Sequence, residues 1–300
     1  MGRCRPEAGR PDLAGRMSRI AYVAGQYLPH RRAAVHIEDR GYQFADGAYE
    51  VIAVIGGQLV DEERHLKRLK RSLAELRIAP PMADSSLKMV IREVVRRNGV
   101  DTGIVYLQAT RGVAPREHAF PKAAKPTLVV TSRRVRPPDP RLGQEGIAVI
   151  TIPDIRWQRC DIKSVALVAN VLGKQQAKEA GAYEAWQVDR DGQVTEGTST
   201  NAWIVTPDNT VVTRAADTAI LNGVTRGAVL DIIERAGYRL VERPFTVAEA
   251  KAAREAFLTS TTADLLPVVR IDEAAVGEGK PGPLSRELRA AYFAHAAAAP

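Results

Sequence analysis

The sequence predicts an α+β fold with two domains. Apolar residues recur with the period of strands in some segments and of helices in others, but the two kinds of segment do not alternate regularly as in a doubly wound sheet. Residues 133–143 (RRVRPPDPRLG) carry three prolines in a charged run, which cannot continue a helix or a central strand. We therefore expect a small N-terminal α/β domain at residues 17–136, a linker at 137–143 and a larger C-terminal domain at 144–300.

The N-terminal half is predicted to open with two hairpins, because short glycine-containing turns (AGQ and GG) separate apolar segments. Helices are expected where leucine and valine recur at helical spacing. The hairpin strands are residues 20–23 with 27–28 and residues 49–55 with 58–60, the helices lie around 66–76 and 87–95, and further strands span 103–110 and 127–132.

The C-terminal half continues with the same two patterns. A strand, an apolar helix and a meander around an Asp191-Gly192 turn precede a second helix, a strand and a final helix. In chain order, these elements span residues 147–152, 165–180, 183–188, 201–205, 222–236, 256–260 and 284–297.

The composition is that of an ordinary globular chain. With 43 Lys and Arg against 35 Asp and Glu, the formal net charge is +8, which favours a small anion, a polyanion or a membrane surface as partner. No segment approaches the roughly 20 apolar residues of a membrane-spanning helix. Two cysteines, Cys4 and Cys160, provide no disulfide framework, which indicates a cytoplasmic setting. Residues 1–16 show neither periodicity nor a signal-peptide core, and we expect a disordered tail.

The common catalytic fingerprints are absent from the sequence. It contains no Walker loop, no G-x-G-x-x-G, no H-E-x-x-H and no G-x-S-x-G. Five His and two distant Cys show no metal-ligand spacing. We therefore expect no metal site, and nucleotide-driven, zinc-dependent and serine-hydrolase chemistry are disfavoured.

Two segments carry side chains suited to other chemistry. Lys163 precedes an apolar helix, where burial would lower its pKa and make the amine a nucleophile able to form a Schiff base; a surface lysine is the alternative. Glu196 lies among hydroxyls and glycine in residues 195–201 (TEGTSTN), where a carboxylate can pair with a protonated heterocyclic nitrogen. A hairpin loop would explain the same residues.

A third segment has the composition of an anion site. Residues 221–226 (LNGVTR) open a predicted helix, whose free amides, glycine and hydroxyl form a phosphate cradle. Capping of the helix by Asn222 is the alternative. A second hydroxyl cluster, residues 259–262 (TSTT), ends a later strand.

Seven ordered motifs match one known family. They are EDRGYQFADGAYE (38–50), HLKR (65–68), TRGVAPREH (110–118), IRWQRCDIKS (155–164), TEGTSTN (195–201), GVTR (223–226) and LTSTT (258–262). On these motifs, which extend from about residue 22 to about residue 271, the chain resembles the fold-type IV pyridoxal-phosphate aminotransferases. The resemblance is strongest to their D-amino-acid branch, the D-alanine transaminases.

The resemblance implies pyridoxal 5'-phosphate as cofactor and assigns residues to it. Lys163 would hold the cofactor as an internal aldimine and move the proton between substrate Cα and cofactor C4′. Glu196 would keep the pyridine nitrogen protonated, which makes the ring an electron sink. Four residues would bind the phosphate and a fifth would pack against the ring: Arg68, Val224, Thr225 and Thr261, with Leu221 on the ring.

The resemblance also implies a substrate and a partner. Tyr49, Arg116 and His118 are similar to the carboxylate trap of the D-amino-acid branch, in which the Arg and His come from the neighbouring subunit of a homodimer. Fixing the substrate carboxylate fixes which Cα hydrogen faces Lys163, so binding geometry sets the chirality. The implied reaction is transamination between a D-amino acid, such as D-alanine, and 2-oxoglutarate or pyruvate in two ping-pong half-reactions.

Two kinds of alternative stay open. A branched-chain L-amino-acid aminotransferase, an R-selective amine transaminase or an aminodeoxychorismate lyase of the same fold would share Lys163 and Glu196 but should lack the paired Arg116 and His118. A basic nucleic-acid-binding protein would use charge runs such as residues 67–71, but the sequence has no recognised reader motif and few aromatics. The motifs favour the D-amino-acid aminotransferase.

Overall fold

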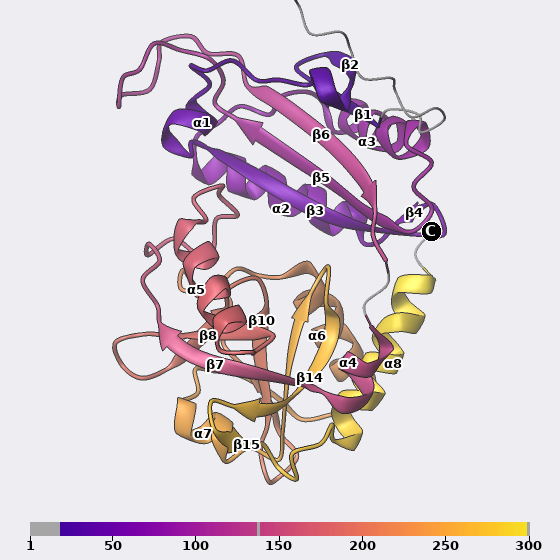
Figure 1. Cartoon of the computed structure of the whole chain (residues 1–300), viewed down its shortest axis with the longest axis vertical. Coiled ribbons are helices and arrows are strands. Elements are labelled where there is room, and N and C mark those ends of the chain that lie inside the picture. The colour runs from indigo at the N-terminus through magenta and orange to yellow at the C-terminus, as the bar shows by residue number, and fades with distance from the viewer. Residues whose placement is uncertain (1–18, 137–138, 299–300) are drawn as a thin grey trace, which may run out of the picture.

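The computed structural model describes residues 19–136 and 139–298 and contains two β-sheets (Figure 1). The predicted tail at 1–16 and the first two residues of the predicted linker lie outside the described residues. Sheets and helices occur together without regular alternation, which confirms the α+β class. The strands of one sheet precede those of the other along the chain. The division into two domains stays a prediction.

The first sheet has six strands in the order β2-β1-β6-β5-β3-β4. β3 and β5 pair antiparallel over most of their length, and this register places Tyr49 opposite Gln108. The predicted GG turn between β3 and β4 has Gly56 and Gly57 at positive φ, as a tight hairpin turn requires. The strands span Ile20–Val23 (β1), Gln26–Pro29 (β2), Gly47–Ile55 (β3), Gln58–Leu59 (β4), Gly103–Thr110 (β5) and Thr127–Arg134 (β6).

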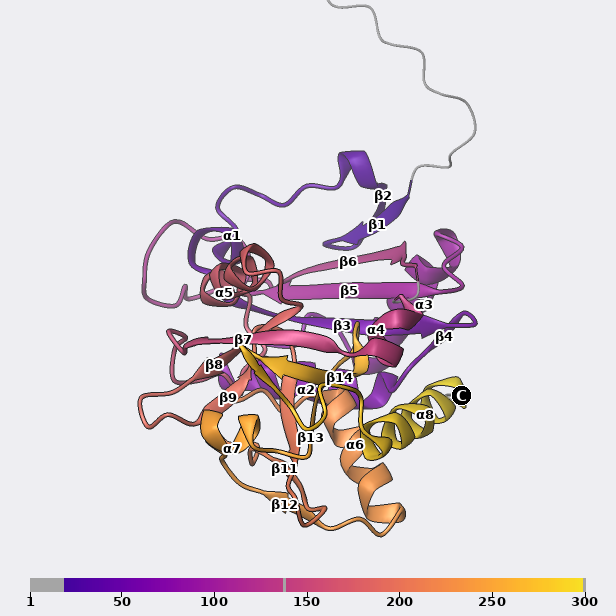
Figure 2. The same ribbon diagram turned by 60° about the horizontal axis from the view of Figure 1, so that its bottom comes forward.

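Two long helices lie along one face of this sheet (Figures 1 and 2). The leucine spacing seen in the sequence places Leu66, Leu69 and Leu73 of α2 in the core beneath β3. Burial of each such side chain contributes roughly 1.5–3 kcal/mol relative to exposure. The helices of this part are α1 (Arg40–Phe44), α2 (Glu62–Glu75) and α3 (Asp84–Arg97), with a 3-10 turn, η1, at His30–Arg32.

The second sheet has the order β12-β11-β10-β13-β14-β7-β8-β9, with β15 beside β14. β7 is parallel to both of its neighbours, and the stacked rings of Trp203 and Phe257 lie in the core between this sheet and helices α6 and α8. Its strands are Ile147–Pro153 (β7), Glu184–Val188 (β8), Val194–Gly197 (β9), Asn201–Val205 (β10), Val211–Thr213 (β11), Leu240–Glu242 (β12), Glu255–Ser260 (β13), Asp264–Ile271 (β14) and Ala274–Ala275 (β15).

Five helices accompany the second sheet in the described part of the chain. They are Pro140–Glu145 (α4), Val168–Glu179 (α5), Val224–Arg235 (α6), Val247–Lys251 (α7) and Pro283–Ala297 (α8). Among the described helices, none combines the length and the apolar character that crossing a membrane requires.

The structure differs from the sequence prediction in the linker, in one loop, in the start of one helix and in elements that no pattern predicted, among them β11, β12 and β14. Helix α4 begins at Pro140, inside the segment predicted as linker, because proline is tolerated in the first helical turn, and Asp139 caps the helix through the Arg141 amide. Residues Val194–Gly197 form strand β9, so the hairpin-loop interpretation of Glu196 is wrong. The helix predicted from residue 165 begins at Val168.

A short backbone contact joins the first sheet to the segment that follows β7. The amide of Tyr49 donates to the carbonyl of Lys163 at 3.0 Å, and the amide of Val165 donates to the carbonyl of Gly47 at 3.0 Å. On the β5 side, a Cβ on Gly47 would lie 2.8 Å from the carbonyl oxygen of Ala109, so the close pairing of β3 with β5 at this position needs glycine. The contact places the start of β3 directly beside Lys163.

Candidate active site

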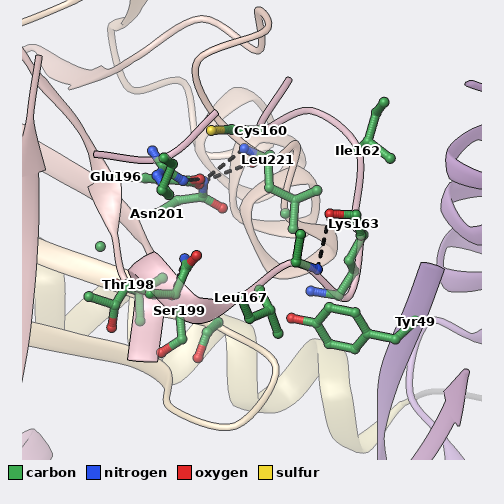
Figure 3. A pocket seen from close by; sticks show the side chains of 18 of the residues that line it. Tyr49, Cys160, Ile162, Lys163, Leu167, Glu196, Thr198, Ser199, Asn201 and Leu221 are labelled. Atoms are coloured by element: carbon green, nitrogen blue, oxygen red, sulfur yellow. Dashed lines mark hydrogen bonds and ion pairs between the residues drawn. The ribbon is translucent and has the colours of Figure 1, made fainter. Parts of the chain in front are cut away.

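Eight of the ten residues predicted for the site line one cavity of about 590 Å³. Figure 3 shows Lys163 beside Tyr49, with Glu196, Asn201 and Leu221 hydrogen-bonded together across the cavity. Arg116 and His118 do not line it. The predicted residues that do are Tyr49, Arg68, Lys163, Glu196, Leu221, Val224, Thr225 and Thr261.

Lys163 lies in the irregular segment between β7 and α5 and is held by its backbone. Its amide donates to Ser72 Oγ at 3.1 Å, and its carbonyl accepts from Tyr49. Its Nζ lies 4.3 Å from the centroid of the Tyr49 ring. Burial lowers the pKa of Lys163 to about 8, and the positive charge of Arg68 acts in the same direction. Near pH 7, a minor fraction of this amine is therefore neutral and nucleophilic, and this fraction is much larger than for an ordinary lysine.

Glu196 projects from β9 as a buried carboxylate with both oxygens engaged. Arg156 donates to Oε1, while the side-chain amide of Asn201 and the backbone amide of Leu221 donate to Oε2 at 3.0 and 3.1 Å. Burial raises the pKa of Glu196, and the charge and hydrogen bond of Arg156 oppose that rise. Arg156 also forms an ion pair with Asp154, with 2.7 Å between Arg156 Nη2 and Asp154 Oδ2. The arrangement presents a carboxylate that can pair with a protonated ring nitrogen.

The start of α6 forms an anion cradle. Helix α6 begins at Val224 with Gly223 as N-cap and without a side-chain cap, so the amides of its first turn are available to a ligand. A Cβ on Gly223 would lie 2.2 Å from Asn201 Oδ1, so the approach needs glycine. Capping by Asn222 is wrong, because its Oδ1 instead accepts from Arg226 at 3.3 Å.

Arg68 reaches the same end of the cavity from α2. Its guanidinium donates two parallel hydrogen bonds to Glu50, both 2.8 Å long, and a third to the backbone carbonyl of Asn222 at 3.1 Å. Although burial raises the pKa of Glu50, Arg68 and His65 outweigh it and lower that pKa to about 2. Glu50 is therefore an ionised carboxylate that fixes the direction of Arg68 beside the cradle.

Arg116 and His118 lie outside this cavity, in the exposed connection between β5 and β6. The guanidinium carbon of Arg116 lies 4.9 Å from the centroid of the Phe44 ring, and the His118 ring lies 5.4 Å from it. Only Tyr49 of the predicted carboxylate trap is therefore beside Lys163 within one chain.

Three site residues received no role from the sequence, namely Glu50, Arg156 and Asn201. Each lies inside one of the seven motifs, so the motifs were the available signal. Cys160 also lines the cavity, but burial raises the pKa of its thiol to about 12, and Sγ donates to the carbonyl of Trp157. The described residues contain no group of three or more His, Cys, Asp or Glu that could hold a metal ion.

The family model for amino-transferase class IV matches residues 47–271. The chain belongs to the class IV aminotransferases. This class IV aminotransferase is 43% identical to a D-alanine aminotransferase of Bacillus licheniformis over 267 residues, which cover 89% of this chain and 93% of the relative. It is 40% identical to a D-alanine aminotransferase of Listeria monocytogenes over 274 residues, which cover 90% and 93%.

Solved structures share the fold. The branched-chain aminotransferase of the archaeon Thermoproteus uzoniensis with norvaline has a TM-score of 0.83 at 23% identity, with 92% of this chain and 94% of that chain covered. The branched-chain amino acid aminotransferase of Escherichia coli has a TM-score of 0.84 at 20% identity, with 92% and 94% covered. At these identities, the likeness concerns the fold alone.

The cofactor of this family is pyridoxal 5'-phosphate, and the cavity of this class IV aminotransferase fits it. The lysine amine, with its lowered pKa, suits the aldehyde, and the buried carboxylate of Glu196 suits the pyridine nitrogen. The start of α6, with Arg68 beside it, suits the phosphate. Lys163, Glu196, Arg68 and Val224 would thus contact the three polar ends of the cofactor.

Proposed function

We propose that this class IV aminotransferase transfers the amino group of a D-amino acid, such as D-alanine, to 2-oxoglutarate or pyruvate in two ping-pong half-reactions. The observation that carries the proposal is the convergence of Lys163, Glu196 and the anion-binding start of α6 on one cavity. The D-alanine aminotransferases at 40% and 43% identity support a D-amino acid as the substrate.

Each of these cavity residues has its own role in the proposed reaction. Bound pyridoxal 5'-phosphate supplies an electron sink for the electron pair left at substrate Cα. Lys163 Nζ would hold the cofactor, and the same amine would move a proton from substrate Cα to cofactor C4′ in one half-reaction and in the reverse direction in the other, a role that suits a base with a pKa of about 8. Glu196 holds a proton at the pyridine nitrogen, because Arg156 and two amide donors favour its ionised form.

The substrate carboxylate would be bound by Tyr49 of one subunit with Arg116 and His118 of the partner subunit. The exposure of both side chains outside their own cavity supports their use by a second copy. Helix α5 and the segment before it also expose apolar side chains beside the cavity, including those of Val168, which is 75% exposed, and Val171, which is 62% exposed. Apolar patches of this kind are typical of subunit contacts. The cytoplasmic setting indicated by the cysteine content stays a prediction.

A matched assay tests the function. The holoenzyme receives D-alanine, L-leucine or an R-amine as amino donor, with 2-oxoglutarate or pyruvate as acceptor, and initial rates give kcat/KM for each pair. We expect D-alanine to be preferred. A preference for L-leucine would instead favour a branched-chain L-amino-acid aminotransferase, the kind of enzyme found among the solved structures that share this fold. A preference for the R-amine would also contradict the proposal.

A further inference from the structure

The connection between β5 and β6, residues 111–126, is described throughout and carries Arg116 and His118. It contains no helix and no strand, only an isolated bridge from Val113 to Asp39. Figure 1 shows this connection projecting beyond α1, away from the two sheets. Side chains on such a segment keep a fixed orientation toward a ligand only when other groups hold the backbone in place. The contacts of the connection therefore decide where Arg116 and His118 point.

One buried guanidinium binds three successive carbonyls of this segment. Arg40, at the start of α1, is only 3% exposed, and it donates to the carbonyls of Glu117, His118 and Ala119. Its Nε donates to Asp46 at 2.8 Å, which neutralises the buried charge. The backbone on both sides of His118 is thus tied to α1 by one side chain.

The ring of Phe44, at the other end of α1, holds the side chains of the same segment. Its centroid lies 4.8 Å from the guanidinium carbon of Arg40 and 4.9 Å from that of Arg116. The ring of His118 lies against it at 5.4 Å. Cation–π contacts of this kind favour one placement of a guanidinium over an aromatic face.

Asp46 connects this anchor to a second one. The Asp46 carboxylate accepts from Arg111 as well as from Arg40, with Arg111 Nε 2.7 Å away. The guanidinium carbon of Arg111 lies 3.7 Å from the centroid of the Phe120 ring. Residues 117–119 are therefore held by Arg40 and, through the adjacent Phe120, by Arg111.

We propose that Arg40 is a positioning residue for substrate binding, which holds Arg116 and His118 in the orientation that receives the substrate carboxylate. The inference rests on the proposed function, in which these two side chains bind that carboxylate. Arg40 itself does not touch the cavity. Its effect is exerted through the three carbonyls and through Phe44.

The test compares two variants of the full-length holoenzyme. Arg40→Lys keeps the charge beside Asp46 but lacks the planar fork that reaches several carbonyls. We expect its kcat/KM for D-alanine to fall about 10- to 100-fold through KM, as misplacement of a binding group does, while kcat and the dissociation constant of pyridoxal 5'-phosphate stay near the wild-type values. Arg134→Lys is the control, because Arg134 also binds a backbone carbonyl, that of Gly99, but far from the segment.

A double-mutant cycle separates the inference from the proposed function. If Arg40 acts through Arg116, Arg40→Lys costs less in the Arg116→Met background than in the wild type. If Arg116→Met raises KM but Arg40→Lys does not, the inference is wrong and the proposed function stands. If Arg116→Met leaves KM for D-alanine unchanged, the carboxylate trap itself is wrong, and the inference falls with it.

A second variant covers the case in which Arg40→Lys does not fold. Phe44→Leu removes the ring that contacts Arg116 and His118 but leaves the hydrogen bonds of Arg40 in place. We expect the same rise in KM with an unchanged cofactor dissociation constant. An unchanged KM in a folded Phe44→Leu protein would overturn the inference that Arg40 and Phe44 orient Arg116 and His118.

Discussion

The amino nitrogen of Lys163 lies 4.3 Å from the centroid of the Tyr49 ring. The backbone hydrogen bond from the Tyr49 amide to the Lys163 carbonyl sets this proximity, so both side chains start from one fixed point. The ring contacts the amine, and burial lowers the pKa of Lys163 to about 8. Two sections of the chain far apart in sequence thereby produce one reactive amine.

The first prediction concerns the pH dependence of cofactor attachment. Because the pKa of Lys163 is lowered to about 8, the neutral amine becomes the main form above that pH rather than above the usual value for lysine. We expect the rate at which the apo-protein attaches pyridoxal 5'-phosphate to rise up to about pH 8 and then to level off. Borohydride fixation at each pH followed by peptide mass analysis measures the label at Lys163. A rate that keeps rising to about pH 10, the ordinary range of a lysine, would contradict the lowered pKa.

The second prediction concerns Lys163→Ala. Among the described residues, no other lysine lines the cavity, so the variant should lose both attachment and proton transfer. Loss of the proton-transfer role alone corresponds to about 10²- to 10⁴-fold in rate, and we expect at least that loss in transamination of D-alanine. Lys178→Ala on the exposed part of α5 is the control and should keep full activity. Comparable activity in both variants would remove Lys163 from the mechanism.

Much of the fold and most of the site are predictable from the sequence, and Lys163 and Arg156 illustrate the limit. The position of Lys163 before an apolar helix is a local pattern that fits a buried lysine and a surface lysine alike, and only the resemblance of its motif to the family assigns the residue to the site. Arg156 acts on Glu196 only because β7 lies beside β8 and β8 beside β9. That adjacency is a property of the strand order, which no local pattern near Arg156 contains.

The same reasoning explains the errors in the predicted elements. The prolines predict no helix at residues 137–143, but Pro140 occupies the first turn of α4, where its missing N–H costs nothing. The residues of strand β9, Thr195 and Gly197 among them, are typical of turns and so favour a loop. Pairing with β8 overrides that local preference.

The third prediction concerns Arg156→Gln. Arg156 is the strongest group that opposes the burial-induced rise in the pKa of Glu196, so its loss should raise that pKa further. Infrared spectra of the apo-protein would then show the protonated carboxyl band at higher pH, with Glu196→Gln identifying the band. We also expect about 10- to 100-fold weaker binding of pyridoxal 5'-phosphate, because a protonated Glu196 would lose its charge-assisted hydrogen bond to the pyridine nitrogen, and such a bond contributes about 1.5–3 kcal/mol. Arg159→Gln is the control, because Arg159 is a half-buried neighbouring arginine that pairs with Glu75 and Asp161. An unshifted band would show that the amides of Asn201 and Leu221 suffice.

The last prediction concerns Arg116→Met. A charge-assisted bond to the substrate carboxylate contributes about 1.5–3 kcal/mol, and each 1.4 kcal/mol corresponds to about tenfold in affinity. We therefore expect KM for D-alanine to rise about 10- to 100-fold while the dissociation constant of pyridoxal 5'-phosphate stays unchanged, because Arg116 does not line the cofactor cavity of its own chain. Lys122→Met removes the same charge from an exposed position of the same connection and should leave KM unchanged. Equal effects of the two substitutions would mean that the connection attracts the substrate by net charge, and equal loss of cofactor binding would mean that Arg116 supports the cavity rather than the carboxylate.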